Sequence, residues 1–428
     1  MTTKLTDKNI SNVSNLGIQW QAVIVADGST ATSVEAGKGY FIDTTSNAHT
    51  VTLPSSPNAG DTIAIKDYAG TFATNNLTIS RNGHNIQGVA NDSLISTNRA
   101  NVELAYIDAT KGWLYTNESN VADLQNKTYV TATGGTITTS GDFKIHAFTG
   151  DGCFVVSCAG NPAGSNSLSN VLVVAGGGGG GRADIGAGGG AGGLRNTACV
   201  AVSVQTYPIT VGGGGAAQPS LAQGNNGSNS VFSTITSTGG GGGGGAAPPY
   251  GPEPGNPGGS GGGGANACGT GGTGNTPPVS PSQGNDGGPG ATSNPTGGGG
   301  VGGGGGGATA VGGGGPSPDG GNGGAGLDVS PFFGAAPQPF YQANQTCRGA
   351  TACGQFAGGG GGAGDGPGGS EGGVGGVGGG GKGSSPGNNS GYAGTTNSGG
   401  GGGGGENTRA DGGAGGSGIV IIRYKFQN

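Results

Sequence analysis

Short runs in which apolar and polar residues alternate cover the chain from Trp20 to about residue 120. They read GYFIDTT, HTVTLP, DTIAIKDY, NLTISRNG, NVELAYID and KGWLYTN. Asn-Gly, Ala-Gly and Pro-containing turns separate these runs, and a period of two residues bounded by such turns is typical of β-strands. The pattern carries no helix signal. It predicts a small β-rich domain over residues 20–120.

Strand-like segments also bracket the second half of the chain. DFKIHAFTGDGCFVVSC and NVLVVAG precede the first glycine tract, CVAVSVQTYPITV separates it from the next, and GIVIIRYKF stands near the C-terminus. The last segment crowds β-branched and aromatic residues as a paired strand does. We expect a sheet whose first and last strands lie close together, with the glycine tracts emerging from one side.

Polar stretches divide the chain further. Residues 1–19 are polar and rich in Asn, Ser and Lys, which indicates an attachment segment, and residues 121–142 are interpreted as a linker. Residues 143–428 form the glycine-rich head. The chain is therefore predicted to be all-β, with a small β domain followed by a glycine-rich domain that a β-sheet brackets.

Glycine accounts for 112 of the 428 residues, whereas ordinary proteins contain about 7%. A flexible linker is one interpretation of such tracts, but a linker does not need the strands that bracket them. Collagen is excluded because glycine does not recur strictly at every third position. Glycine comes instead in blocks, such as residues 239–245, 297–307 and 399–405. The ordered alternative is a bundle of polyglycine-II-like helices that hydrogen-bond to one another, since only glycine permits such close approach on every side.

Charge and hydropathy argue against two classes of partner. The net charge is −6, so we expect no nucleic-acid binding, because a net negative protein lacks the electrostatic attraction to phosphates. No apolar run approaches the roughly 18 residues that cross a bilayer, and the N-terminus lacks the hydrophobic core of a signal peptide. We expect a soluble protein with no membrane insertion.

Because the chain contains so much glycine, it matches motifs of catalytic and cofactor sites by chance. Gly176, Gly178 and Gly181 follow a strand as in G-x-G-x-x-G, but the glycines after them cannot form the helix that a dinucleotide site requires. Gly376 to Lys382 imitates a P-loop, but Gly383 follows in place of Ser or Thr. No pair of carboxylates is placed for glycan cleavage. We expect no cofactor and no enzymatic activity.

The six cysteines leave their chemical state open. They are Cys153, Cys158, Cys199, Cys268, Cys347 and Cys353. None forms a C-x-x-C pair and the three histidines lie far from most of them, so no zinc site is expected. Free or buried thiols are one interpretation. A local Cys347–Cys353 disulfide is the alternative, because it would close a loop that is poor in apolar residues.

Four stretches of the first domain carry a family resemblance: YFIDTT, VTLPSSPNAGDTIAIKD, NNLTISRNGHNIQG and VELAYIDATKGWLY. Together they resemble a module that recurs in bacteriophage tail fibres, most specifically in the corner from Leu53-Pro54 to Gly60-Asp61 and in Gly112-Trp113. The resemblance implies a structural segment that forms a homotrimer. The second half resembles the glycine-rich domains of phage adhesins and, more distantly, a glycine-rich region of some animal receptor kinases, which implies polyglycine-II packing.

Aromatic residues return in islands between the glycine tracts, and they are the candidates for recognition. The candidate receptor-binding residues are Phe332, Phe333, Phe340, Tyr341, Arg348, Tyr250 and Tyr392. Aromatic faces and flanking amides suit contact with sugars or with loops of a surface protein, and the alternative is that they cover the bundle as a small local core. Residues 328–356 are the longest island, where Arg348 would act as an orienting donor.

These features predict a tail fibre or adhesin on the virion surface of a tailed phage, on the tail or the capsid. Its N-terminus would attach to other virion proteins, and its head would recognise a glycan or an outer-membrane protein of the host cell. A non-binding capsid or tail decoration protein is the second hypothesis. A glycan depolymerase is the third.

Overall fold

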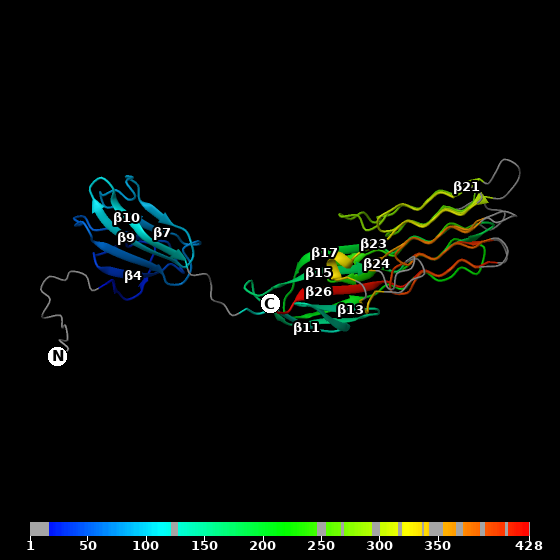
Figure 1. Ribbon diagram of the computed structural model, residues 1–428, viewed down its shortest axis with the longest axis horizontal. Coiled ribbons are helices and arrows are strands. Elements are labelled where there is room, and N and C mark those ends of the chain that lie inside the picture. Colours follow the sequence, from blue (N-terminus) through cyan, green and yellow to red (C-terminus); the bar gives the residue numbers. More distant parts are fainter. Residues whose placement is uncertain are drawn as a thin grey trace. The chain divides into compact units, whose positions relative to one another are not determined.

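The computed structural model describes residues 17–120, 127–245, 254–266, 269–292, 300–315, 319–335, 338–341, 354–364, 371–385, 390–406 and 410–427. The chain divides into two compact units, Met1–Gln125 and Asn126–Asn428 (Figure 1). Strands supply nearly all of the regular structure, and α1 (Ser330–Phe333) is a single short turn. The all-β prediction is therefore confirmed.

The first unit consists of two sheets that share one core. One sheet has the order β1 (Gln19–Trp20), β4 (Lys38–Asp43), β6 (Thr62–Asp67), β9 (Ala100–Asp108) and β10 (Gly112–Asn120), and β2 (Ile24–Val25) also pairs with β4. The other sheet has the order β3 (Thr32–Ser33), β5 (His49–Thr52), β7 (Leu77–Ser80) and β8 (Ser93–Ile95). Alternate residues of both sheets, such as Ile42, Ile63 and Leu77, are buried in one cluster, as the period of two predicts.

The Gly112-Trp113 pair closes this core. Gly112 has a φ of 70°, and a Cβ at this position would collide with the carbonyl oxygen of Asn85. The next amide, that of Trp113, donates to the same oxygen at 2.9 Å, and the indole ring is fully buried. Glycine is required at position 112 because both the backbone torsion and the close approach exclude a side chain.

Two five-stranded sheets form the base of the second unit. The first has the order β11 (Val130–Thr133), β14 (Gly152–Ala159), β18 (Thr206–Thr210), β19 (Ser230–Phe232) and β20 (Ile235–Ser237). The second has the order β12 (Thr136–Ser140), β13 (Phe143–Phe148), β26 (Ile419–Lys425), β15 (Ser167–Val174) and β17 (Leu194–Ala201). Two of these strands, β11 and β12, lie within the segment that the sequence suggested was a linker, 121–142, where Thr-rich alternation gives a weak strand signal.

Strand β26 lies between β13 and β15, so the last strand pairs with the first strands of the unit, as expected. Its residues Ile419 and Ile421 face one cluster of buried side chains, and Val420 and Ile422 face another. A strand that is buried on both faces needs apolar residues at consecutive positions. This explains the uninterrupted GIVII run. Three strand pairs are small: β16 (Arg182–Ala183) with β25 (Gly405–Glu406), β21 (Ala291–Thr292) with β22 (Gly300–Val301), and β23 (Leu327–Asp328) with β24 (Gln355–Phe356).

The glycine tracts form extended runs that lie alongside one another (Figure 1). In the run 176–181, successive amides donate to three different neighbours, and the same neighbour returns at every third residue. The bonds, at 2.8–3.0 Å, run from Gly176 to Ser228, Gly177 to Gly416, Gly178 to Gly190, Gly179 to Asn225, Gly180 to Gly413 and Gly181 to Ala187. A repeat of three is what an extended helix with three residues per turn requires.

The run 186–193 is enclosed by other runs. Its amides donate to residues within 238–244, 303–306 and 399–405, and its carbonyls accept from residues within 175–181, 260–263 and 360–363. Backbone groups that would otherwise be buried without partners are therefore satisfied by six neighbours. Apart from the run at 176–181, the segments that meet here are far from 186–193 in the sequence.

Glycine is needed in these runs for space and not for unusual torsions. None of the glycines in 176–181 or 186–193 has a φ in the left-handed region. A Cβ at Gly189 would nevertheless lie well inside 3.0 Å of the carbonyl oxygen of Gly178, a separation that real Cβ atoms essentially never show. Neighbouring backbones occupy the volume in which side chains would lie.

The core between the two base sheets contains a fully buried histidine. His146 Nδ1 lies 2.7 Å from the carbonyl oxygen of Gly134, and Nε2 lies 3.0 Å from the Tyr424 hydroxyl oxygen. A carbonyl can only accept, so Nδ1 carries the proton and Nε2 of the neutral ring accepts from Tyr424. Burial lowers the pKa of His146 below its ordinary value of 6.5.

The buried histidine makes the second unit sensitive to acid. Below about pH 6.5 the unfolded chain binds a proton at His146 that the folded chain resists, so the free energy of unfolding falls as the pH drops. We expect this loss to begin as the pH falls through about 6.5, the ordinary histidine pKa, in denaturant titrations of the full chain. The variant His146→Gln is expected to lose a smaller part of its stability over the same fall in pH, and an equal pH dependence in both proteins would contradict the assignment.

Candidate functional site

The aromatic island after residue 327 packs largely onto the second base sheet. Phe333, Phe340 and Tyr341 are at most 4% exposed, and they share a cluster with Phe356 and with residues of β13, β15 and β26. The rings of Phe340 and Tyr341 meet edge to face with centroids 4.8 Å apart. The Tyr341 hydroxyl donates to the carbonyl oxygen of Gly334 at 2.7 Å, and burial raises the pKa of this hydroxyl well above its ordinary value. These three residues support the island from inside and offer no surface for contact.

Phe332 differs from its neighbour because its side chain is 37% exposed. The guanidinium of Arg423 in β26 donates from Nη1 to the carbonyl oxygen of Phe332 at 2.9 Å. The same guanidinium lies over the Phe143 ring, 3.6 Å from its centroid, and burial lowers the pKa of Arg423. At the start of α1, Asp328 Oδ1 accepts from the amide of Ser330 at 2.9 Å. The turn that presents Phe332 is thus held at both ends.

Phe332 forms part of the wall of a cavity of about 330 Å³, which we call the β17 cavity. It is lined by Leu194, Arg195, Asn196, Thr197, Pro281, Ser282, Ala308, Thr309, Leu327 and Phe332. The lining comes from the start of strand β17, from two turns of the glycine array and from the segment around α1. Its volume lies at the small end of the range of about 300–1,000 Å³ for ligand pockets.

Hydrogen bonds fix the turns that line the β17 cavity. The carbonyl oxygen of Gln283 accepts from the amide of Leu194 at 2.8 Å, and its buried side-chain oxygen accepts from the amide of Thr238 at 2.8 Å. On the opposite turn, the amide of Ala308 donates to Ala357 at 2.9 Å. The walls are therefore set by the scaffold before any ligand binds.

The other predicted recognition residues do not join this cavity. Tyr392 is 48% exposed, and its backbone is bonded within the array, to the carbonyl oxygen of Lys382 and the amide of Gly403, both at 2.9 Å. Tyr250 and Arg348 lie outside the described residues, as does the Cys347–Cys353 pair. Cys153, Cys158 and Cys199 are free thiols.

Most of the residues that line the β17 cavity could not be predicted from the sequence. Asn196, Ser282 and Thr309 stand in ordinary polar contexts and come from three separate parts of the chain. The one available signal was the polar triplet Arg195-Asn196-Thr197, which interrupts an otherwise apolar strand. Such an interruption indicates an exposed edge, but it does not indicate what covers that edge.

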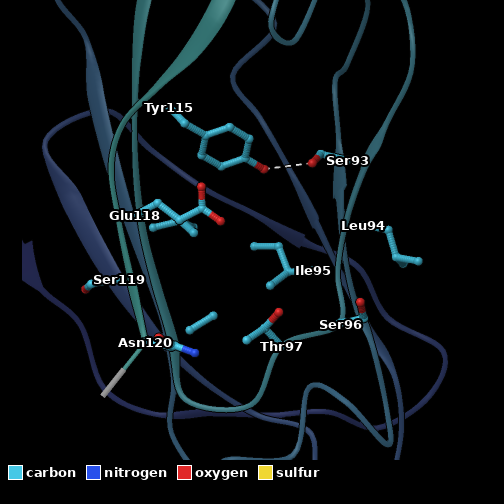
Figure 2. Close-up of a pocket in the computed structure, with 11 residues that line it drawn as sticks. Ser93, Leu94, Ile95, Ser96, Thr97, Tyr115, Glu118, Ser119 and Asn120 are labelled. Atoms are coloured by element: carbon cyan, nitrogen blue, oxygen red, sulfur yellow. Dashed lines mark hydrogen bonds between the residues drawn. The ribbon is translucent and has the colours of Figure 1, made fainter. Parts of the chain in front are cut away.

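A second cavity, of about 410 Å³, lies in the first unit between β8 and β10. Figure 2 shows Tyr115 and Ser93 on opposite sides of it, joined by a hydrogen bond of 2.7 Å between their hydroxyls. Burial raises the pKa of Tyr115. Glu118 is the one carboxylate among the described residues that line this cavity, so they do not supply the two carboxyl groups that glycan hydrolysis uses.

The described residues contain no group of three or more His, Cys, Asp or Glu side chains arranged to hold a metal ion. No helix in the described part of the chain has the length and apolar character needed to cross a membrane.

Comparison with known families gives two matches. Residues 160–425, more than half of the chain, match the family model described as a glycine-rich domain. Residues 8–122 match the model described as Bacteriophage T4 gp9/10-like protein, N-terminal. No curated protein matches the chain.

Proposed function

We propose that this chain, which belongs to the glycine-rich domain family and matches a phage T4 gp9/10-like N-terminal domain over residues 8–122, recognises the surface of the host cell. The N-terminal match supports a structural protein of a phage tail, and therefore a protein of the virion. The observation that carries the recognition proposal is the β17 cavity, where an exposed aromatic side chain lies on turns that are fixed by hydrogen bonds. The proposed role is binding without catalysis.

The glycine array acts as the scaffold of this head. Because its interior consists of backbone, it offers little chemistry that could distinguish one receptor from another. Side chains return at the turns between runs, and loops on a rigid scaffold can vary without changing the fold. Recognition is therefore assigned to the turns, with Phe332 and Tyr392 as the exposed aromatic residues and with Tyr250 and Arg348 as further candidates.

We further propose that the glycine runs have polyglycine-II conformation. The three-residue repeat of hydrogen bonds in 176–181 and the close approach of six neighbours to 186–193 support this. A crystal structure is expected to give φ near −75° and ψ near +145° along both runs. Runs with alternating torsions of a β-strand would contradict the proposal.

We propose that the first unit forms a homotrimer. Residues 1–19 would attach this trimer to other virion proteins. Trp20, Val23 and Val25 are 45%, 38% and 68% exposed along the edge formed by β1 and β2. An exposed apolar sheet edge is a surface that native proteins cover. A symmetric assembly of copies would cover it.

Light scattering on the full chain is expected to give a mass three times that of the 40.0 kDa protomer. Val25→Lys should shift this mass toward that of the protomer, because a charge at the edge opposes its burial. Val89→Lys serves as the control, since Val89 is also exposed, at 53%, but lies outside β1 and β2. A monomeric wild-type protein at micromolar concentration would refute the trimer.

The proposed recognition is tested by competition. Purified full-length protein, added in excess to cells of the bacterium that the phage infects, is expected to bind the cells and to slow adsorption of the phage at least about tenfold. Protein that neither binds cells nor slows adsorption would favour the alternative of a tail or capsid decoration protein. Heat-unfolded protein at the same concentration is the control for non-specific effects.

A further inference from the structure

The free edge of strand β17 supplies unused backbone groups to the β17 cavity. In an antiparallel ladder, alternate residues bond to the neighbouring strand and the residues between them face away. The amide of Leu194 donates outward to Gln283, away from β15. Asn196, two residues further along, therefore also turns its N–H and C=O outward, and neither has a hydrogen-bond partner among the described residues.

This free edge is too short to bind an extended peptide as an added strand. At one end the Leu194 amide is already occupied by Gln283. At the other end Cys199 has a φ of 55°, which breaks the extended geometry. Strand addition draws its affinity from a series of main-chain hydrogen bonds, and the interval between these two limits contains only two outward-facing residues, Asn196 and Ala198. A compact ligand fits this edge better than an extended one.

The chemistry around Asn196 combines an apolar wall with neutral polar groups. Phe332, Leu327 and Ala308 contribute the apolar side. Asn196 accepts weakly from Asn170, at 3.5 Å, which leaves its own amide nitrogen as a donor without a partner in the described structure. The hydroxyl of Thr309 donates to the carbonyl oxygen of Ala325 at 3.1 Å, so its oxygen remains able to accept.

We propose that the β17 cavity binds a single sugar ring of a surface saccharide. A sugar presents an apolar C–H face that can lie against Phe332 and a rim of hydroxyls that can both donate and accept. The outward N–H and C=O of Asn196, its side-chain amide and the Thr309 hydroxyl provide the complementary set. Described carboxylates are absent from the lining, and Arg195 is its one charged residue. This inference rests on the proposed recognition of the host surface.

Saturation-transfer NMR of the full chain tests the proposal directly. The probes are the methyl glycosides of glucose, galactose, N-acetylglucosamine and rhamnose, each at about 10 mM. We expect at least one of them to bind, Phe332→Ala to weaken that binding at least about tenfold, and Ala308→Trp to abolish it by filling the cavity. Val311→Trp adds the same bulk at a side chain that is 62% exposed and outside the lining, so it should bind as the wild type does.

Binding of none of the four glycosides would overturn the proposal, and so would binding that survives Ala308→Trp in a protein with unchanged thermal unfolding. If Ala308→Trp does not fold, Phe332→Ala is compared with Val311→Trp: equal glycoside binding by these two variants would overturn the proposal. Preferential binding of trialanine would also overturn it, in favour of a peptide ligand. Adsorption to host cells is measured separately: a wild-type protein that adsorbs but binds no glycoside refutes the sugar site alone, and a protein that binds a glycoside but does not adsorb refutes the recognition role alone.

Discussion

Replacing Gly189 by alanine is expected to lower the free energy of unfolding of the second unit by about 1–3 kcal/mol or more, as overpacking of a close-packed interior does. The new Cβ would collide with the backbone of Gly178. That backbone cannot move freely, because Gly178 donates to Gly190 and accepts from Gly402. Denaturant titration of the full chain measures the change.

Gly213→Ala is the matched control. Gly213 is exposed, has no left-handed φ, and would place its Cβ with nothing within 4 Å. Its substitution should therefore be close to neutral or slightly stabilising, because alanine restricts the unfolded chain. Alanine is not excluded from the runs in general, since Ala187 and Ala191 are fully buried in the run that contains Gly189. Equal effects of Gly189→Ala and Gly213→Ala would show that composition, and not position, governs the array.

Phe333→Ala is expected to cost about 3–5 kcal/mol of stability, the range for truncating a buried phenylalanine. Phe333 is fully buried in the cluster that attaches the aromatic island to β26 and β15. Phe332→Ala should cost much less, because the Phe332 side chain is 37% exposed and its anchor, the bond from Arg423, uses the backbone carbonyl. Chemical denaturation of both variants makes the comparison.

The two phenylalanines should also separate stability from recognition. Under conditions where both variants are folded, Phe332→Ala is expected to reduce adsorption to host cells, whereas Phe333→Ala should reduce it only as far as its folded fraction falls. A stable Phe333→Ala protein with lost adsorption would instead assign direct contact to Phe333 and would require the island to open.

The sequence was sufficient for the general architecture. Alternation in the first domain and the GIVII run of β26 predicted the strands, and β26 does pair with β13 and β15. The resemblance to a phage tail fibre with a glycine-rich domain is confirmed by the two family matches. These features are local, because side-chain periodicity directly reflects which face of a strand is buried.

The order of the glycine runs could not be read from the sequence. Runs such as 176–181 and 399–405 are nearly identical in composition, so nothing in a run identifies its neighbours. Their arrangement depends on hydrogen bonds between segments far apart in the chain, for example Gly189 to Gly402. The turns between the runs and the strands of the two base sheets must therefore determine which runs lie side by side.

The candidate site could be predicted only in part, because its residues also come from segments that are far apart in the sequence. Adjacent Phe332 and Phe333 are equivalent as sequence, yet one lines a cavity and the other is in the core, because α1 turns them to different sides. The remaining cavity residues come from β17 and two turns that the array brings together. That juxtaposition is a property of the fold.

Hydrogen exchange of the glycine amides tests the central claim, that the glycine array is a folded, backbone-bonded scaffold. We predict that amides in 186–193, 239–244 and 302–307 are protected to a degree comparable with those of β15 and β26, since all amides of these three runs are hydrogen-bonded and lie in buried residues. Exchange of the glycine amides within seconds, alongside protected amides in β15 and β26, would show that the tracts are flexible linkers attached to a folded base and would contradict the account.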